Sequence, residues 1–178
     1  MSSNREVVRY RNNLTGKYDG KKSKRLRTIK GVVCVVILIG IVFGLIIGTS
    51  TVDGQSMEPT LHNGQQLFFL RHVKEYKVGD IISMRMPSGD YYVKRIVATE
   101  GDIVEISDGK LIVNGSEAED ANANGSTYEQ ENTVVYPYTV GEDAYFVLGD
   151  NREHSIDSRS FGAIVKYQIR GRILGNYD

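Results

Sequence analysis

An uninterrupted apolar run, Gly31–Gly48, is the feature that most constrains what this 178-residue chain can form. The run contains no charged residue. As an α-helix it would be about 27 Å long, close to the thickness of the hydrocarbon core of a bilayer. A buried helix in a soluble domain of this size is rarely apolar on every face. The sequence therefore predicts a single transmembrane helix over residues 31–48.

The same run could instead belong to a cleaved signal peptide. Such peptides have an apolar core of about 7–15 residues behind a short basic region. Here the apolar core is longer, and the basic region before it occupies residues 1–30. Both differences favour a retained anchor, so the lipid bilayer is an expected partner.

Charge is unevenly distributed around this run, although the formal net charge of the chain is zero. Residues 1–30 contain ten Lys or Arg against two acidic residues, whereas residues 49–178 contain twelve against twenty. A basic run can bind nucleic acid, but its position directly before an apolar segment favours a membrane surface, and we expect no nucleic-acid partner. The positive-inside rule predicts a cytoplasmic tail over residues 1–30 and an extracytoplasmic body over residues 49–178. The tail has no apolar periodicity, so we expect it to be mostly disordered.

The body is predicted to be mainly β, because short branched and aromatic runs alternate with turn signals and no long helical period follows residue 48. Cys34, the only cysteine of the chain, lies in the apolar run. The body can therefore form no internal disulfide, and core packing alone must hold it together. The pattern indicates a compact antiparallel sheet or barrel-like domain. Residues 108–143 are expected to form a small hairpin or loop extension, with residues 117–133 at the surface. The predicted strands are Gln66–Leu70, Asp80–Met86, Tyr91–Ala98, Asp102–Ile106, Lys110–Val113 and Ala144–Leu148.

A serine loop, Asp53-Gly-Gln-Ser-Met-Glu-Pro-Thr-Leu61, follows the apolar run after a few residues. Gly54 permits backbone angles that other residues avoid, and Pro59 fixes φ and removes a donor. This chemistry predicts a tight, exposed loop that carries the Ser56 hydroxyl. Gly, Ser and Pro are also common in ordinary turns, so the loop alone does not establish a reactive serine.

Histidines offer little support for a metal site or a Ser-His-Asp triad. His62, His72 and His154 are scattered, without the spacing of metal ligands and without a cysteine partner. A triad can be built from residues in any chain order, but each histidine is more simply explained as a solvated side chain. We therefore expect no metal and no cofactor.

Lys94 is a candidate general base. Alternation along Tyr91–Ala98 places Lys94 on one face of the strand and Arg95 on the other, so one of the two cations must share a face with apolar side chains. A lysine in that position loses solvation, which lowers its pKa and favours the neutral amine. A neutral amine can accept the proton of a serine hydroxyl, whereas an arginine stays protonated. A lysine on an edge strand that reaches water remains the alternative.

A dense polar loop, Gly149–Gly162, follows the last predicted strand. It contains acidic, basic and hydroxyl side chains that can form ion pairs and brace a neighbour. Exposed ion pairs contribute little stability each, so this loop alone could be an ordinary surface loop. The side chains concerned are Asp150, Arg152, Ser155, Asp157, Ser158 and Arg159.

Four segments together resemble the type I signal peptidases, membrane-bound serine proteases that remove signal peptides from exported proteins. The resemblance rests on their order and spacing behind an N-terminal anchor, and the single anchor is similar to the Gram-positive form of the family. The segments are Gly54–Leu61, Val78-Gly-Asp-Ile-Ile82, Tyr92-Val-Lys-Arg-Ile-Val97 with Gly101-Asp102, and Gly149–Arg159.

The resemblance implies a role for each matching residue. Ser56 would be the nucleophile, Lys94 the general base, and Ser155 would hydrogen-bond and orient Lys94. Met57 would line the substrate cleft, which would accept small side chains one and three residues before the cut. The remaining implied role is structural: Asp150, Asp157 and Arg159 would hold the last loop in shape by ion pairing.

One departure from the family concerns the oxyanion hole. The backbone N–H of Ser56 would donate to the oxyanion, and some members add a serine hydroxyl two residues earlier. This chain has Gly54 there, so a glycine N–H or a water would have to replace that donor. Losing one such donor costs other hydrolases about 3–4 kcal/mol of transition-state stabilisation.

Two other classes remain open from the sequence. Self-cleaving repressors of the bacterial damage response share a Ser-Lys dyad but lack a membrane anchor. A catalytically inactive or specialised membrane-tethered β domain could bind or process particular surface proteins. Exported preproteins are the partners that the family resemblance implies.

Overall fold

The computed structural model describes residues 3–130 and 134–175. It begins with one continuous helix, α1 (Ser3–Ile46). The part of α1 long and apolar enough to cross a membrane is Lys22–Ile46. The expectation of disorder over residues 1–30 is therefore wrong for residues 3–30, which are helical. This tail contains good helix formers and is joined to an apolar helix, so it extends a helix already nucleated.

The end of α1 also differs from the sequence prediction. The helix ends at Ile46, and strand β1 (Ile47–Thr51) starts immediately. Gly48, counted with the apolar run, lies in this strand against the ring of Phe69: a Cβ at position 48 would come within 2.2 Å of that ring. Tertiary packing of a glycine thus converts the end of an apolar run into a strand.

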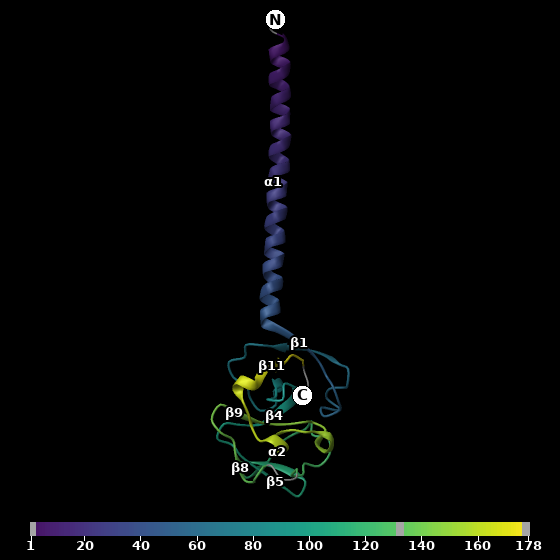
Figure 1. The fold of residues 1–178 in the computed structure, drawn as a ribbon, viewed down its shortest axis with the longest axis vertical. Coiled ribbons are helices and arrows are strands. Elements are labelled where there is room, and N and C mark those ends of the chain that lie inside the picture. The colour runs from purple at the N-terminus through teal and green to yellow at the C-terminus, as the bar shows by residue number, and fades with distance from the viewer. Residues whose placement is uncertain (1–2, 131–133, 176–178) are drawn as a thin grey trace. The chain divides into compact units, whose positions relative to one another are not determined.

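The body, which starts at Ile46, contains two antiparallel sheets. The larger sheet has the order β1–β2–β11–β3–β4–β9–β10 and the smaller has the order β7–β6–β5–β8. Figure 1 shows β5 and β8 at the opposite end of the body from β1. The strands of the larger sheet after β1 are β2 (Gln66–Leu70), β3 (Ile81–Arg85), β4 (Tyr91–Thr99), β9 (Ala144–Leu148), β10 (Ile164–Val165) and β11 (Ile169–Ile173). Those of the smaller sheet are β5 (Ile103–Ser107), β6 (Lys110–Val113), β7 (Ser116–Glu117) and β8 (Tyr138–Thr139).

Short helices complete the body near its C-terminal part: the 3-10 helices η1 (Arg152–His154) and η2 (Lys166–Gln168), and α2 (Ser158–Phe161). The mainly antiparallel β class predicted from the sequence is confirmed, and strands occur in all six predicted runs. Strand β11 was missed because Ile-Arg-Gly-Arg-Ile has a glycine and two arginines, which hide the alternation of apolar residues.

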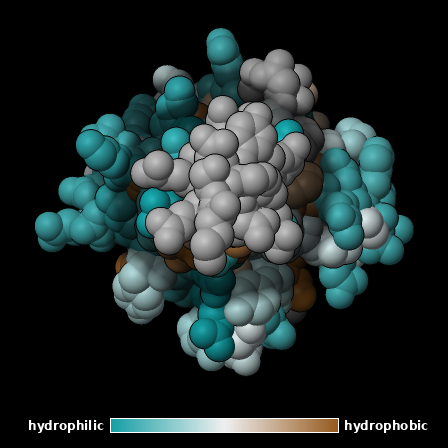
Figure 2. All heavy atoms as spheres, turned by 90° about the horizontal axis from the view of Figure 1, so that it is seen from above, coloured by the Kyte–Doolittle hydropathy of each residue, from teal (hydrophilic) through white to brown (hydrophobic). Residues whose placement is uncertain are grey.

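Apolar side chains anchor the serine loop in the core of the body. Met57 and Leu61 are fully buried in a cluster with Leu67 and Phe69 of β2 and Ile173 of β11. The loop is therefore part of the core rather than a mobile turn at its edge. The visible surface of the body is mostly hydrophilic in Figure 2, as expected of a domain that faces water.

Candidate active site

The loop around Ser56 is shaped by Gly54. Gly54 has a φ of +95°, where a side chain would strain the backbone although it would meet no neighbour. Its N–H donates to Asn63 Oδ1 at 3.0 Å. Two turn bonds, Glu58 N–H to Gln55 O at 3.1 Å and Leu61 N–H to Met57 O at 2.9 Å, close the loop. These bonds hold Ser56 at the half-buried bend.

Lys94 reaches this serine from β4. Its Nζ donates to Ser56 Oγ at 2.5 Å, across 38 positions of sequence. The lysine is 4% exposed, and its Nζ lies 5.7 Å from the centre of the Tyr92 ring. Burial lowers the pKa of Lys94 from its ordinary value to about 8, an effect that Asp157 opposes and Arg159 reinforces. A substantial fraction of neutral amine is thus available beside the hydroxyl near neutral pH.

Arg95, the next residue of β4, is also 4% exposed. The sequence required only one of the two cations to be buried, but both faces of β4 are covered. Arg95 donates from Nε and Nη2 to the two oxygens of Asp150, each at 2.9 Å, and from Nη1 to Gly79 O at 3.0 Å. The neighbouring cations therefore have opposite surroundings: Arg95 is neutralised by a carboxylate, and Lys94 is hydrogen-bonded to a neutral hydroxyl.

Asp150 joins three segments. Besides its ion pair with Arg95, its Oδ2 accepts the hydroxyl of Thr60 in the serine loop. The family resemblance implied ion pairing that shapes the last loop, but the cationic partner of Asp150 lies on β4. Asp150 therefore connects the last loop to β4 and to the serine loop.

Asp157 and Arg159 do form a pair within the last loop. Arg159 Nε and Nη2 donate to the Asp157 carboxylate at 2.9 Å, and both side chains are buried. Asp157 Oδ2 also accepts the Gly149 N–H at 3.0 Å, and Arg159 Nη2 donates to Arg152 O at 2.7 Å. The pair thus ties the start of the loop to its end.

Ser155 is buried, yet its Oγ has no hydrogen-bond partner among the residues that the structure describes. The bond to Lys94 that the family resemblance implied is therefore absent here. Ser155 instead packs against Gly149, where a Cβ would lie 2.2 Å from Ser155 Oγ and 2.4 Å from Ser56 O. Only a glycine at position 149 lets the two serine segments approach this closely.

Met57 lines the cleft that contains the dyad. The cleft has a volume of about 260 Å³ and includes Ser56, Lys94 and the apolar side chains of Val52 and Val93. A hollow of this size suits small side chains.

The histidines do not form a triad with Ser56. No hydrogen bond joins His62, His72 or His154 to Ser56 in the described parts of the chain. His154 lies on the rim of the cleft, with Nδ1 3.3 Å from Asn151 Oδ1. Within residues 3–130 and 134–175, no group of three His, Cys, Asp or Glu side chains could hold a metal ion.

Sequence reasoning missed Asn151. Its N–H donates to Ser56 O at 3.0 Å, and its Nδ2 donates to Gln55 O at 3.2 Å. These bonds fix the carbonyl groups on either side of the Ser56 nitrogen. An asparagine after a Gly-Asp pair was a detectable polar residue, but no pattern in the sequence reveals the partner of its amide.

The stretch 117–130 is a mostly exposed loop, as the prediction of a surface loop or hairpin extension expected, but it also contacts the last loop; residues 131–133 lie outside the described residues. Asn124 exchanges backbone bonds with the last loop, its N–H to Asp150 O at 2.7 Å and its O from the Arg152 N–H at 2.9 Å. The buried Arg152 donates to Thr127 Oγ1 at 2.6 Å and forms an ion pair with Asp120. The acidic, glycine-rich composition indicated a solvated segment, but it did not reveal these bonds from Asp120, Asn124 and Thr127 to the last loop.

Comparison with known proteins identifies a family that the chain matches. A model of the family described as "Signal peptidase, peptidase S26" matches residues 25–177. The chain belongs to this family. It is 34% identical to "Signal peptidase I" of Bacillus amyloliquefaciens over 161 residues, covering 85% of this chain and 86% of that protein. It is 35% identical to "Signal peptidase I S" of Bacillus subtilis (strain 168) over 164 residues, covering 85% and 88%.

A solved structure is also similar: a signal peptidase I from Enterococcus faecalis V583 is 28% identical, with a TM-score of 0.46, covering 58% of this chain and 100% of that chain. Family membership makes the chain a serine peptidase of the signal peptidase type. It does not favour an inactive tethered β domain.

Proposed function

We propose that this signal peptidase removes N-terminal signal peptides from exported preproteins, with Ser56 as nucleophile and Lys94 as general base. The contact of 2.5 Å between Lys94 Nζ and Ser56 Oγ is the observation that carries the assignment. A buried lysine with a pKa of about 8 can be neutral when it meets the hydroxyl.

In the proposed acylation, neutral Lys94 takes the Ser56 proton as Oγ attacks the carbonyl carbon of the bond to be cleaved. The resulting ammonium passes this proton to the leaving amine, and the acyl group stays on Ser56. In deacylation the neutral lysine takes a proton from water, and the hydroxide attacks the ester. The proton then returns to Ser56 Oγ as the acyl group leaves, so the dyad is restored.

The oxyanion would be stabilised first by the Ser56 N–H, which makes no hydrogen bond within the described residues. The Gly54 N–H is unsuitable as the second donor because Asn63 already accepts it. A water is therefore the proposed replacement for the serine hydroxyl that some relatives carry. Asn151 would support this geometry by holding the carbonyl groups of Gln55 and Ser56 in place.

The proposed topology has a single membrane pass over Lys22–Ile46, with the N-terminus in the cytoplasm and the body outside. The ten Lys or Arg within residues 1–30 support this orientation. Protection of the body from added protease in sealed right-side-out vesicles would contradict it.

Cleavage of a preprotein by the purified chain in detergent tests the function. The intact chain should release a signal peptide after a small residue, and Ser56→Ala should not. Ser160→Ala is a matched control, since it removes a hydroxyl elsewhere in the body. Cleavage that persists in Ser56→Ala would contradict the proposal.

A further inference from the structure

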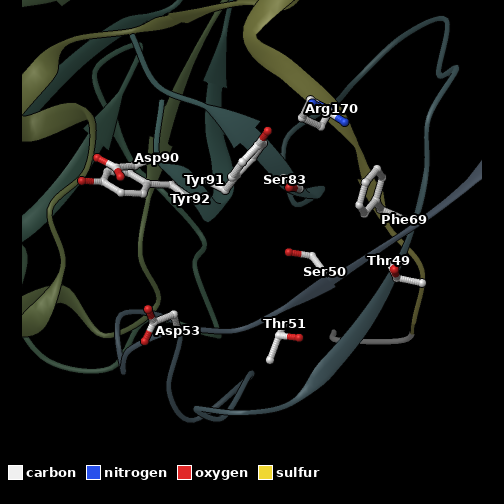
Figure 3. A pocket seen from close by; sticks show the side chains of 10 residues that line it. All are labelled: Thr49, Ser50, Thr51, Asp53, Phe69, Ser83, Asp90, Tyr91, Tyr92 and Arg170. Atoms are coloured by element: carbon white, nitrogen blue, oxygen red, sulfur yellow. The ribbon is translucent and has the colours of Figure 1, made fainter. Parts of the chain in front are cut away.

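A second hollow continues the active-site cleft (Figure 3). We call it the distal groove; its volume is about 610 Å³, larger than that of the cleft. The groove is lined by hydroxyl, aromatic and charged side chains, and it lacks Val52, Met57 and Val93, which line the cleft beside Ser56. The residues that line both hollows are Ser50, Thr51, Asp53, Tyr91 and Tyr92.

Strand directions show how a substrate could occupy the groove. Four antiparallel pairings separate β1 from β4, so the two strands run in the same direction. The chain runs from β1 into the loop that carries Ser56, and Lys94 lies within β4. An extended peptide covers about 3.3 Å per residue, so four to six residues span about 13–20 Å from the dyad into the groove.

The amino-terminal side of the cut is the side that fits the groove. The pocket for small residues before the cut includes Val52, Met57 and Tyr92, and Tyr92 also lines the groove. The rim formed by His154 and Ile156 lines the cleft but not the groove. Substrate residues farther upstream of the small-residue pocket would therefore continue into the groove.

A β-bulge directs Arg170 into the groove. In the pairing of β11 with β3, Ile169 is opposite Met84 and Gly171 is opposite Ser83, so Arg170 is an extra residue between them. Such bulges redirect a side chain. Gly171 is confined, because a Cβ there would lie 2.3 Å from Leu70 O. The backbone after Arg170 is therefore closely packed, which favours a fixed position for the bulge.

Arg170 has unused hydrogen-bonding capacity. Its guanidinium carbon lies 5.5 Å from the centre of the Tyr91 ring, and in the described ranges it makes no ion pair and no side-chain hydrogen bond. Figure 3 shows it well separated from Asp53 and Asp90, the acidic residues of the groove. A guanidinium has five donors and binds a carboxylate in a bidentate manner.

We propose that Arg170 is a specificity-determining residue that binds a carboxylate side chain of the preprotein, four to six residues before the cut. This inference rests on the proposed function and adds a charge preference to it. Since the guanidinium lies over the Tyr91 ring, a carboxylate would bind its free donor edge, where both charges lose part of their water, and the preference should be measurable in kcat/KM.

A peptide series tests the preference with the full chain in detergent. The peptides share one cleavage site and carry Glu, Gln or Lys at one position, four, five or six residues before the cut. At one of these positions the intact chain should cleave the Glu peptide about tenfold faster than the Lys peptide, equivalent to about 1.4 kcal/mol. Arg170→Gln should remove this ratio, and Arg170→Glu should reverse it.

Arg85→Gln is the matched control. Arg85 also lies over the Tyr91 ring, at 6.0 Å, but it is exposed and does not line the groove. This variant should keep the ratio of the intact chain. A Glu-to-Lys ratio that is the same in the intact chain and Arg170→Glu overturns the inference, as does a preference found only after the cut. Failure of the intact chain to cleave even the Gln peptides and a preprotein would instead overturn the proposed function.

Discussion

The two faces of β4 carry neighbouring cations in contrasting settings. On one face, Lys94 lines the cleft beside Ser56 and is hydrogen-bonded to Ser56 Oγ. On the other, Arg95 is paired with both oxygens of Asp150 and sealed in the body. Burial is the same, but the first cation has a lowered pKa and the second is neutralised by an adjacent carboxylate. The difference teaches that the partner of a buried cation, rather than its burial, separates a reactive site from a structural one.

Removing the reactive cation should have the largest effect. Lys94→Ala should lower kcat/KM for a preprotein by about a thousandfold or more, because no other base contacts Ser56 Oγ in the described residues. The body should remain folded by circular dichroism. Lys110→Ala, which removes an exposed lysine of β6, should retain full activity. Cleavage by Lys94→Ala at the normal rate would show that Lys94 is not the reactive cation of β4.

Removing the partner of the structural cation should act on stability. Asp150→Asn leaves the Arg95 charge buried and unpaired, so the free energy of unfolding should fall by about 3–5 kcal/mol in a urea titration. Arg95→Met with Asp150→Leu should recover part of this loss, because neither charge remains. Glu117→Gln breaks the exposed pair with Lys110 and should cause little change. An equal loss in Asp150→Asn and Glu117→Gln would contradict the assigned role of the buried pair.

The pH dependence of cleavage should report only the reactive cation. The base must be neutral, so kcat/KM should fall about tenfold per pH unit below the Lys94 pKa of about 8. The same lowered pKa should also make the free energy of unfolding depend on pH, above pH 8 rather than below it. Between pH 8 and 10.5 the unfolded lysine holds more protons than the folded one, so the free energy of unfolding should rise with pH.

Lys94→Met should flatten this rise. An activity profile that stays level from pH 8 down to about pH 6 would show that Lys94 is not the base.

Two serines of the last loop give the smallest expected difference. Ser158 Oγ accepts the Val147 N–H at 2.9 Å, whereas Ser155 Oγ has no partner within the described residues. Ser158→Ala should therefore reduce the free energy of unfolding by about 1–3 kcal/mol, and Ser155→Ala should leave it nearly unchanged. If Ser155→Ala destabilises the body as much as Ser158→Ala, its hydroxyl has a bond in solution. A shift of the activity profile in Ser155→Ala would show that the bond orients Lys94.

The sequence predicted those parts of the fold that depend on local pattern. Short branched and aromatic runs between turn signals located β2, β4 and β9, and continuous hydropathy located the apolar part of α1. Sequence-based prediction failed where contacts with distant parts of the chain override local preference. The start of β1 was missed because it lies in the apolar run, and the packing of Gly48 against Phe69 could not be predicted. β11 was missed because its bulge at Arg170 interrupts the strand pattern.

The candidate site divides in the same way. Desolvation of Lys94 follows from alternation in one strand, and its approach to Ser56 was expected from the family resemblance. The carboxylate partner of Arg95 lies 55 positions away, so nothing local could identify Asp150. Likewise the bonds from Asn124 and Asp120 to the last loop are long-range, and their acidic, glycine-rich segment resembles solvated chain.

The protonation of Lys94 itself is the most direct test of the central claim. The amine can be followed by NMR with nitrogen-labelled lysine in the intact chain and in Lys94→Arg, which assigns the Lys94 signal by its loss. We predict that Lys94 titrates with a pKa of about 8 in the folded chain. A Lys94 signal that stays protonated up to the ordinary value of 10.5 would contradict the account.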